Sequence, residues 1–288
     1  MPSGIVIIDK PADWTSMDVC AKLRGILKER RIGHGGTLDP MATGVLPVFV
    51  GNATKAVEFA EKGDKEYVAG LRLGLTTNTQ DSTGEVLEQR TAHVSREELE
   101  AVLSRFTGPI EQVPPMFSAV KVRGKKLYEL ARKGQEVERK PRPVTIHALE
   151  ILEQDGPERY LLRVRCSKGT YVRTLCHDVG AALGCGGCMD SLRRTMAAGF
   201  PIEQAVTLEQ VQERGESLLL PTDSLFAEYP IFRLSSPKAE KLVRNGSPIA
   251  APDLPPGDYR VYGRGGEFLC LSRHRNGQLK AIKNFFGN

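Results

Sequence analysis

The segment from His34 to Gly44, HGGTLDPMATG, carries the residue types best suited to chemistry. It places one carboxylate, Asp39, among glycines, which adopt backbone dihedrals that other residues avoid and let a ligand approach the main chain. Pro40 favours an extended backbone at Asp39, which restricts where the carboxylate points. A fixed acid on a glycine-rich loop serves catalysis about as often as it marks a tight structural turn, and the local features leave both interpretations open.

Arg173 and Tyr171 belong to a second stretch of interest, CSKGTYVRT. This stretch predicts a strand end, a glycine turn and a helix that begins near Thr170. Arg173 is a candidate ion-pair partner for Asp39 and would hold the acid in one orientation. The alternative is a surface arginine near a helix start. Tyr171 either lines a pocket or fills the core.

Three further positions are weaker candidates. Tyr67, on a predicted strand, either stacks on a planar ligand or fills a half-buried position. His34 is a candidate general base, metal ligand or polar wall, and the lack of a second histidine at ligand spacing disfavours a metal. The sequence LRRT, from Leu192 to Thr195, either offers one apolar and two basic groups to a base and its phosphates or forms a solvated turn.

Length and composition restrict the class of protein. The chain has 288 residues, enough for one large domain or for a large domain with a small one. No apolar run approaches the roughly 20 residues of a membrane span, and the N-terminus lacks a signal-peptide pattern. We therefore expect a cytoplasmic protein that contacts no membrane and keeps its cysteines reduced. Cys185-Gly-Gly-Cys188, near Cys176 and His177, invites a zinc site, but small core cysteines are the simpler interpretation.

Positive charge is concentrated in two places. Residues 121–142 carry nine Lys or Arg against three Glu, and residues 233–288 carry ten against four Asp or Glu. Since the net charge of the chain is only +5, the remainder is acidic. Two basic patches on an otherwise acidic protein favour a polyanionic ligand that binds at both patches. The alternative is that both are simply solvent-exposed surface segments. Glycine fingerprints for phosphate and a Ser-His-Asp set are missing from the sequence, so it predicts a carboxylate enzyme that needs no cofactor.

Strand and helix signals alternate without a βαβ rhythm, which indicates an α+β fold with a mixed sheet. The patterning predicts strands over 5–8, 45–50, 67–75, 144–152 and 160–166. Helices are expected over about 16–30, after the capping boxes at Ser95 and Thr207, and from 170 to 183.

Two stretches depart from this alternation. Residues 107–143 are rich in proline and basic side chains and predict an excursion from the sheet, with a short helix over 127–132. Beyond residue 230, short strands separated by glycine turns predict a small β-rich domain, with a hairpin at Asn276-Gly277. We therefore expect a catalytic domain over 1–230 and a binding domain over 231–288.

The stretch HGGTLDPMATGVLPVFVGNATK closely resembles the catalytic motif of the TruB family, the bacterial tRNA pseudouridine-55 synthases. Further stretches fit the same family in order: DKP…TS at 9–16, KEY at 65–67, QVPPMFSAVK at 112–121, KGTYVR at 168–173 and LRRT at 192–195. The C-terminal tail, with Asn245-Gly246, resembles a PUA RNA-binding domain. The resemblance implies a pseudouridine-synthase mixed β-sheet core with flanking helices, a thumb insertion at about 107–143 and a PUA domain.

The resemblance also implies the reaction centre, with Asp39 as the essential catalytic carboxylate and Arg173 as its ion-pair partner. The implied reaction detaches the uracil of uridine 55 in the tRNA T-loop from C1′, rotates it and rejoins it through C5. Because no atom is gained or lost, we expect no metal or redox cofactor. Asp39 either adds covalently to the sugar or base or takes a proton from the sugar, and the sequence does not choose between these.

Five other site residues follow by position. Tyr67 would stack on the flipped uracil, and His34 would help to hold the everted stem-loop. Tyr171 and Leu192 would wall the pocket. Lys10 would lie near the cleft, with a weaker claim to direct contact.

The implied partner is the T-arm stem-loop of a tRNA, with no protein partner required and a monomeric enzyme. Two other functions stay open. The first is a dyskerin-type relative that uses a guide RNA, which the long thumb at 107–143 disfavours. The second is a tRNA-binding folding factor in which catalysis is secondary.

Overall fold

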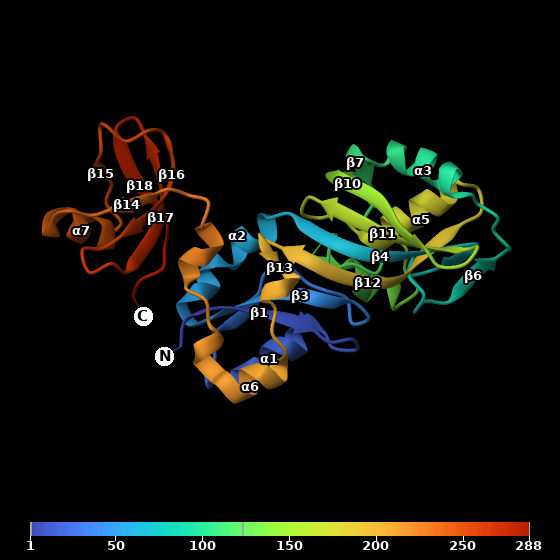
Figure 1. Cartoon of the computed structure of the whole chain (residues 1–288), viewed down its shortest axis with the longest axis horizontal. Helices are drawn as coiled ribbons and strands as arrows, with labels where there is room; N and C mark the ends of the chain where they lie inside the picture. Colours follow the sequence, from blue (N-terminus) through green and yellow to red (C-terminus); the bar gives the residue numbers. More distant parts are fainter. Residues whose placement is uncertain (1, 123, 288) are drawn as a thin grey trace.

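The computed structural model describes residues 2–122 and 124–287. Arg123 of the thumb insertion, and Met1 and Asn288 at the outer ends of the two expected domains, lie outside the described residues. The described chain forms one large sheet flanked by helices and one small sheet that stands to its side (Figure 1). This is the α+β architecture with a mixed sheet that the sequence predicts.

The large sheet runs in the order β1 (Gly4–Lys10), β3 (Thr43–Val50), β12 (Gly187–Ala197), β4 (Lys65–Leu73), β11 (Arg159–Cys166), β10 (Arg142–Gln154) and β7 (Gly108–Gln112). Two short strands extend it, with β2 (Ile32–His34) beside β3 and β13 (Phe200–Pro201) beside β12. Along this order only the β3–β12 pair is parallel.

Helices cover the sheet on both faces. α1 (Ser16–Leu27) and α6 (Leu208–Arg214) pack on one face of β1 and β3, and α2 (Val57–Lys62) packs on the other. α3 (Arg96–Arg105) and α5 (Val172–Ala182) cover β4, β10 and β11 (Figure 1). The capping boxes predicted at Ser95 and Thr207 are confirmed. α1 ends three residues before the predicted Arg30, because Lys28 adopts a left-handed backbone conformation.

The seam between β3 and β12 joins the two halves of the sheet through only two residue pairs, Arg193 with Thr43 and Arg194 with Gly44. Gly44 has φ +98°, and a Cβ there would lie 2.2 Å from the Arg194 carbonyl oxygen. Only glycine allows this approach. The alternative of a solvated turn at Leu192–Thr195 is wrong, since these residues lie within a central strand whose side chains alternate between the two faces.

The thumb insertion is smaller than predicted. Its first and last residues belong to the large sheet, where β7 and β10 pair from Gln112 with Arg142 to Gly108 with Ile146. What leaves the sheet contains the hairpin of β8 (Lys121–Val122) and β9 (Lys125–Lys126) and the short helix α4 (Leu127–Ala131). A second hairpin, β5 (Leu75–Thr77) with β6 (Val86–Gln89), extends from the end of β4.

The small sheet has the order β14 (Ile231–Arg233), β16 (Gly257–Tyr262), β17 (Phe268–Arg275), β18 (Gln278–Asn284) and β15 (Ile249–Ala250). The predicted hairpin at Asn276-Gly277 is confirmed, and both residues have positive φ. The helix α7 (Pro237–Arg244) was not predicted, although Ser236 caps it and a proline opens it. The small sheet has a hydrophobic core of its own, and Leu271 and Phe268 of β17 also pack in the core beneath β1 and β3.

Three further expectations concern membranes and cysteines. No helix within 2–122 or 124–287 is long and apolar enough to cross a membrane. All six cysteines are unbonded, and Cys176 is buried in α5. Over the same residues, no group of three or more His, Cys, Asp or Glu side chains is placed to hold a metal ion, so the Cys185 and Cys188 pattern does not converge with its neighbours.

Candidate active site

Asp39 lies in the loop that leads into β3, and Arg173 lies in the first turn of α5. Arg173 Nη2 is 3.4 Å from Asp39 Oδ2, so the predicted ion pair is confirmed. The Arg173 side chain is 9% exposed and that of Asp39 is 37% exposed. The acid is therefore held from behind by a buried guanidinium while part of its carboxylate faces solvent.

Asp81 is a second carboxylate on the same arginine, and the sequence analysis did not identify it. Arg173 Nη1 is 3.4 Å from Asp81 Oδ2, and Arg173 Nη2 donates to the carbonyl of Phe117 at 2.7 Å. The other oxygen of Asp81 accepts hydrogen bonds from Thr83 N, Thr83 Oγ1 and Thr79 Oγ1. The only sequence signal was the polar run TTNTQDSTG after a predicted strand.

Lys10 lies behind the Asp39 loop. Its side chain is fully buried. Its ammonium donates to the carbonyls of Pro11, Trp14 and Pro40, at 2.8, 2.6 and 3.1 Å. Ser16 Oγ accepts from the Leu38 N–H at 2.9 Å, immediately before Asp39. The DKP…TS stretch thus holds the Asp39 loop through Lys10 and Ser16. The ammonium of Lys10 already donates to three backbone carbonyls.

Tyr67 and His34 flank the loop. Tyr67, on β4, packs in the same core as Leu38 and Ala42. Burial raises the pKa of Tyr67, and the charge of nearby Arg194 opposes that rise. His34 ends β2, and burial, with Arg194, lowers the pKa of His34 below its usual 6.5, so its imidazole is neutral at pH 7.

Tyr171 and Leu192 complete the predicted set. The backbone N–H of Tyr171 donates to Gln112 Oε1 at 2.8 Å, and its carbonyl accepts from Gln112 Nε2 at 3.0 Å. This buried glutamine ties the start of the thumb to the start of α5. The Arg173 guanidinium lies 6.0 Å from the centre of the Tyr171 ring. Leu192, on β12, packs against the core that contains Tyr67.

Three buried polar atoms of the predicted site and the adjoining thumb have no hydrogen-bond partner among the residues described: Arg173 Nε, His34 Nδ1 and Ser118 Oγ. Buried polar groups are normally paired, and these three atoms, which are shielded from solvent, are exceptions. An oriented carboxylate, on a loop that packs with an aromatic ring and follows a neutral imidazole, suits nucleophilic or base chemistry on a planar organic ligand.

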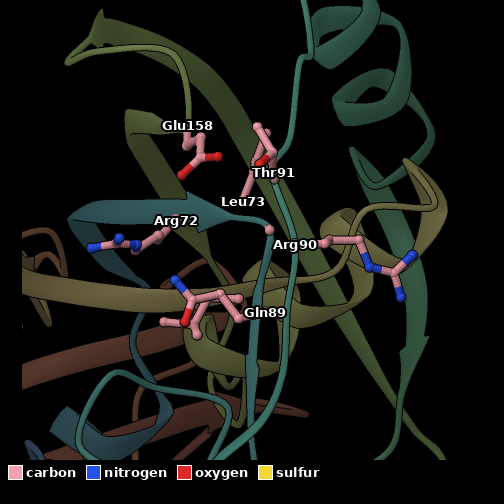
Figure 2. Close-up of a pocket in the computed structure, with 8 residues that line it drawn as sticks. Arg72, Leu73, Gln89, Arg90, Thr91 and Glu158 are labelled. Atoms are coloured by element: carbon pink, nitrogen blue, oxygen red, sulfur yellow. The ribbon is translucent and has the colours of Figure 1, made fainter.

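A pocket of about 350 Å³ lies elsewhere, at the end of β4 next to the β5–β6 hairpin. Its lining consists of Arg72, Leu73, Gly74, Leu75, Gln89, Arg90, Thr91 and Glu158. The Arg72 and Arg90 side chains point in opposite directions (Figure 2). None of the residues that the sequence analysis selected lines it, and its charged groups do not converge on one point.

Comparison with known proteins identifies the family. A model of the N-terminal domain of TruB family pseudouridylate synthases matches residues 24–172, and a model of the tRNA pseudouridylate synthase B C-terminal domain matches residues 173–227. The small sheet begins at Ile231, after both matches.

Individual relatives agree with these matches. The chain is 45% identical over 281 residues to a tRNA pseudouridine synthase B of Azoarcus sp. (strain BH72), covering 96% of this chain and 93% of the relative. It is 43% identical over 290 residues to a tRNA pseudouridine synthase B of Cupriavidus metallidurans (strain ATCC 43123 / DSM 2839 / NBRC 102507 / CH34), covering 96% and 92%. Its fold is similar to that in a crystal structure of a Cbf5-Nop10-Gar1 complex, with a TM-score of 0.76 and 27% identity over 98% of this chain and 85% of that one. The chain therefore belongs to the TruB family of pseudouridylate synthases.

Proposed function

We propose that the protein is a tRNA pseudouridine synthase that isomerises uridine 55 in the T-loop of tRNA, with Asp39 as its catalytic carboxylate. Relatives named tRNA pseudouridine synthase B match 96% of the chain and support the substrate class. The observation that carries the proposal is the Asp39–Arg173 pair, in which a buried guanidinium orients a carboxylate that is open on its other side.

The two carboxylates on Arg173 differ in what they can do. One oxygen of Asp81 accepts three hydrogen bonds, and its side chain is 5% exposed, so it cannot approach a substrate atom. Asp39 carries one ion pair and faces solvent. In the reaction the C1′–N1 bond breaks and a C1′–C5 bond forms. C5 loses its proton and N1 gains one, so the product is an isomer of the substrate. Asp39 acts as the nucleophile or base, and Asp81 holds the arginine that orients it.

The target base must leave its stack to reach Asp39. Unstacking a base costs a few kcal/mol, and stacking on an aromatic side chain returns roughly 1–3 kcal/mol. We assign that stacking to Tyr67, with His34, Tyr171 and Leu192 as the surrounding wall. Lys10, whose ammonium is bonded to backbone carbonyls, acts by holding the Asp39 loop.

Two basic regions would grip the RNA around the flipped base. The thumb meets the site at Phe117, whose carbonyl accepts from Arg173, and it presents exposed cations such as Lys125 and Lys133. The small sheet, with its own core and its basic balance, corresponds to the PUA domain over 231–288, and residues 1–230 form the catalytic domain. Contacts between cations and phosphates make binding dependent on salt.

The test of the proposal is to map pseudouridine in a tRNA transcript after incubation with the pure protein. We expect product at position 55 with the wild type, none with Asp39→Asn, and unchanged product with Asp155→Asn, an exposed acid in the turn between β10 and β11. Asp39→Asn should still bind the transcript, because asparagine keeps the shape of the side chain. Turnover by Asp39→Asn would remove Asp39 from its role.

The thumb is tested by salt dependence. The double variant Lys125→Gln/Lys133→Gln should bind tRNA more weakly at low salt and flatten the plot of log affinity against log salt by roughly 1.5, from two lost phosphate contacts. A matched control, Lys22→Gln/Lys62→Gln, changes the same net charge outside both basic regions. Equal slopes for the two variants would mean that the thumb does not touch RNA.

A guide-dependent synthase is the second candidate, favoured by the similarity to the Cbf5 complex. The hairpin of β8 and β9 with α4 argues for direct grip of the substrate instead. Activity on a bare T-arm stem-loop decides between them, since a guide-dependent enzyme would be inactive on it. If tRNA refolding survives in Asp39→Asn, the protein also acts as a folding factor.

A further inference from the structure

Arg194, on β12, is a buried cation that the mechanism above does not use. Its side chain is 1% exposed, and within 2–122 and 124–287 no carboxylate lies within ion-pair distance of it. Its Nε donates to the Val45 carbonyl at 2.7 Å, and its Nη2 donates to the Gly36 carbonyl at 3.1 Å. A buried charge without a counterion is unfavourable, so a cation kept in this place has a specific task.

The two carbonyls belong to the two ends of the Asp39 loop. Gly36 opens the loop with φ +110°, and Gly44 closes it with φ +98°. The Arg194 backbone lies against Gly44, where a Cβ would be 2.2 Å from its carbonyl oxygen. Its side chain bonds to Gly36 at one end and to Val45, the residue after Gly44, at the other, so it bridges the start and the end of the loop that carries the acid.

The same side chain lies beside the residue assigned to stacking. In the β12–β4 ladder, Arg194 is directly opposite Tyr67. Its charge lowers the pKa of the His34 imidazole and opposes the rise that burial causes in the pKa of the Tyr67 hydroxyl. We propose that Arg194 is a positioning residue that sets the distance between the Asp39 carboxylate and the Tyr67 ring. This inference rests on the proposed function, since the distance matters only if a uridine stacked on the ring reacts at the acid.

The guanidinium is suited to this task because its fork of donors reaches two carbonyls at once. A lysine keeps the charge, but its compact ammonium on a flexible stem replaces the rigid planar fork whose Nε and Nη2 reach the two carbonyls here. A misplacement of about 1 Å in a reacting group lowers the rate roughly 100-fold. Because Arg194 is buried behind the loop, its loss should change the rate and leave RNA binding intact.

The experiment compares Arg194→Lys and Arg194→Gln with a matched control, Arg163→Gln. Arg163 lies on β11 in the same sheet, and it pairs with Glu66 on the opposite face. We measure the single-turnover rate constant for pseudouridine formation per folded protein, and the Kd for a tRNA transcript. We expect the rate to fall about 100-fold in both Arg194 variants with Kd within threefold, and the control to match the wild type.

A second readout does not depend on activity. The Ala42 N–H bonds to the Asp39 carbonyl, and the Leu38 N–H bonds to Ser16. Hydrogen exchange at these loop amides should be at least tenfold faster in the Arg194 variants and unchanged in the control. If Arg194→Gln does not fold, Arg194→Lys, which keeps the charge, carries both measurements.

The outcomes separate this inference from the proposed function. A rate within threefold of the wild type in Arg194→Lys, or a rate loss matched by an equal loss of tRNA affinity, overturns the positioning role. Unchanged exchange in the loop also overturns it. A wild-type protein that makes no pseudouridine contradicts the proposed function, and the exchange result still decides whether Arg194 holds the loop.

Discussion

The replacement Asp81→Asn tests whether the second carboxylate is part of the reaction centre. It removes one of the two acids that share Arg173 and keeps the size of the side chain. The amide oxygen can still accept the bonds from Thr83 and Thr79 that one carboxylate oxygen accepts now. The amide nitrogen then faces the guanidinium, so two donors meet and the Nη1 end of Arg173 loses its partner.

The magnitude follows from burial. Both side chains are less than a tenth exposed, so solvent screens their interaction only weakly. Removing one partner of a buried ion pair costs roughly 3–5 kcal/mol. Since Arg173 keeps Asp39 and the Phe117 carbonyl, we take the lower end, about 3 kcal/mol. If this loss falls on the transition state, the rate drops about 100-fold, because about 1.4 kcal/mol is a factor of ten.

The assay is the single-turnover rate of pseudouridine formation at saturating enzyme, with tRNA affinity and thermal unfolding measured on the same samples. We expect a rate about 100-fold lower with tRNA affinity within threefold. Asp190→Asn is the control, because it removes an acid close to Asp81 whose ion-pair partner is Arg159, at 2.6 Å, and not Arg173. A rate within threefold of the wild type, or an equal loss in the control, would refute the reasoning.

Three other changes give clear expectations. Gly44→Ala places a Cβ 2.2 Å from the Arg194 carbonyl oxygen at a positive φ, so the free energy of unfolding in urea should fall by about 1–3 kcal/mol. An unchanged denaturation midpoint would contradict the close approach of β3 and β12 at Gly44. Burial lowers the pKa of Lys65 to about 8 from 10.5, so between these pH values the unfolded chain binds a proton that the native chain does not, and stability rises with pH. In urea denaturation measured at several pH values, the free energy of unfolding should rise by about 3 kcal/mol more in the wild type than in Lys65→Met between pH 8 and 10.5. The same pH dependence in both proteins would argue against a lowered pKa for Lys65. Phe226→Ala removes a ring that is 2% exposed and that packs against Phe268 of the small sheet and Phe285 just after it. The free energy of unfolding should fall by about 3–5 kcal/mol, and limited proteolysis should cut the chain near residue 230. Protection equal to that of the wild type would show that this ring does not hold the small sheet against the large one.

Local patterns predicted much of this fold correctly. The capping boxes at Ser95 and Thr207 start helices where expected, and Asn276-Gly277 turns the predicted hairpin, because these signals act within a few residues. The loop around Asp39 was also recognisable, since glycine and proline restrict the backbone wherever they occur. The pairing of Arg173 with Asp39 was predicted as one of two alternatives, and it is confirmed.

Contacts between distant segments were beyond local patterns. LRRT is as polar as a surface turn, yet it forms a central strand because β3 and β4 pair on either side of it. The ammonium of Lys10 is held by backbone carbonyls, and Asp81 reaches Arg173 across 92 residues of sequence. A side chain's own neighbours in sequence indicate its chemistry, but burial and counterions come from strands that meet only when the whole sheet has formed. For that reason the acid and its candidate arginine could be found in the sequence, while Asp81 and the backbone bonds of Lys10 could be found only in the folded chain.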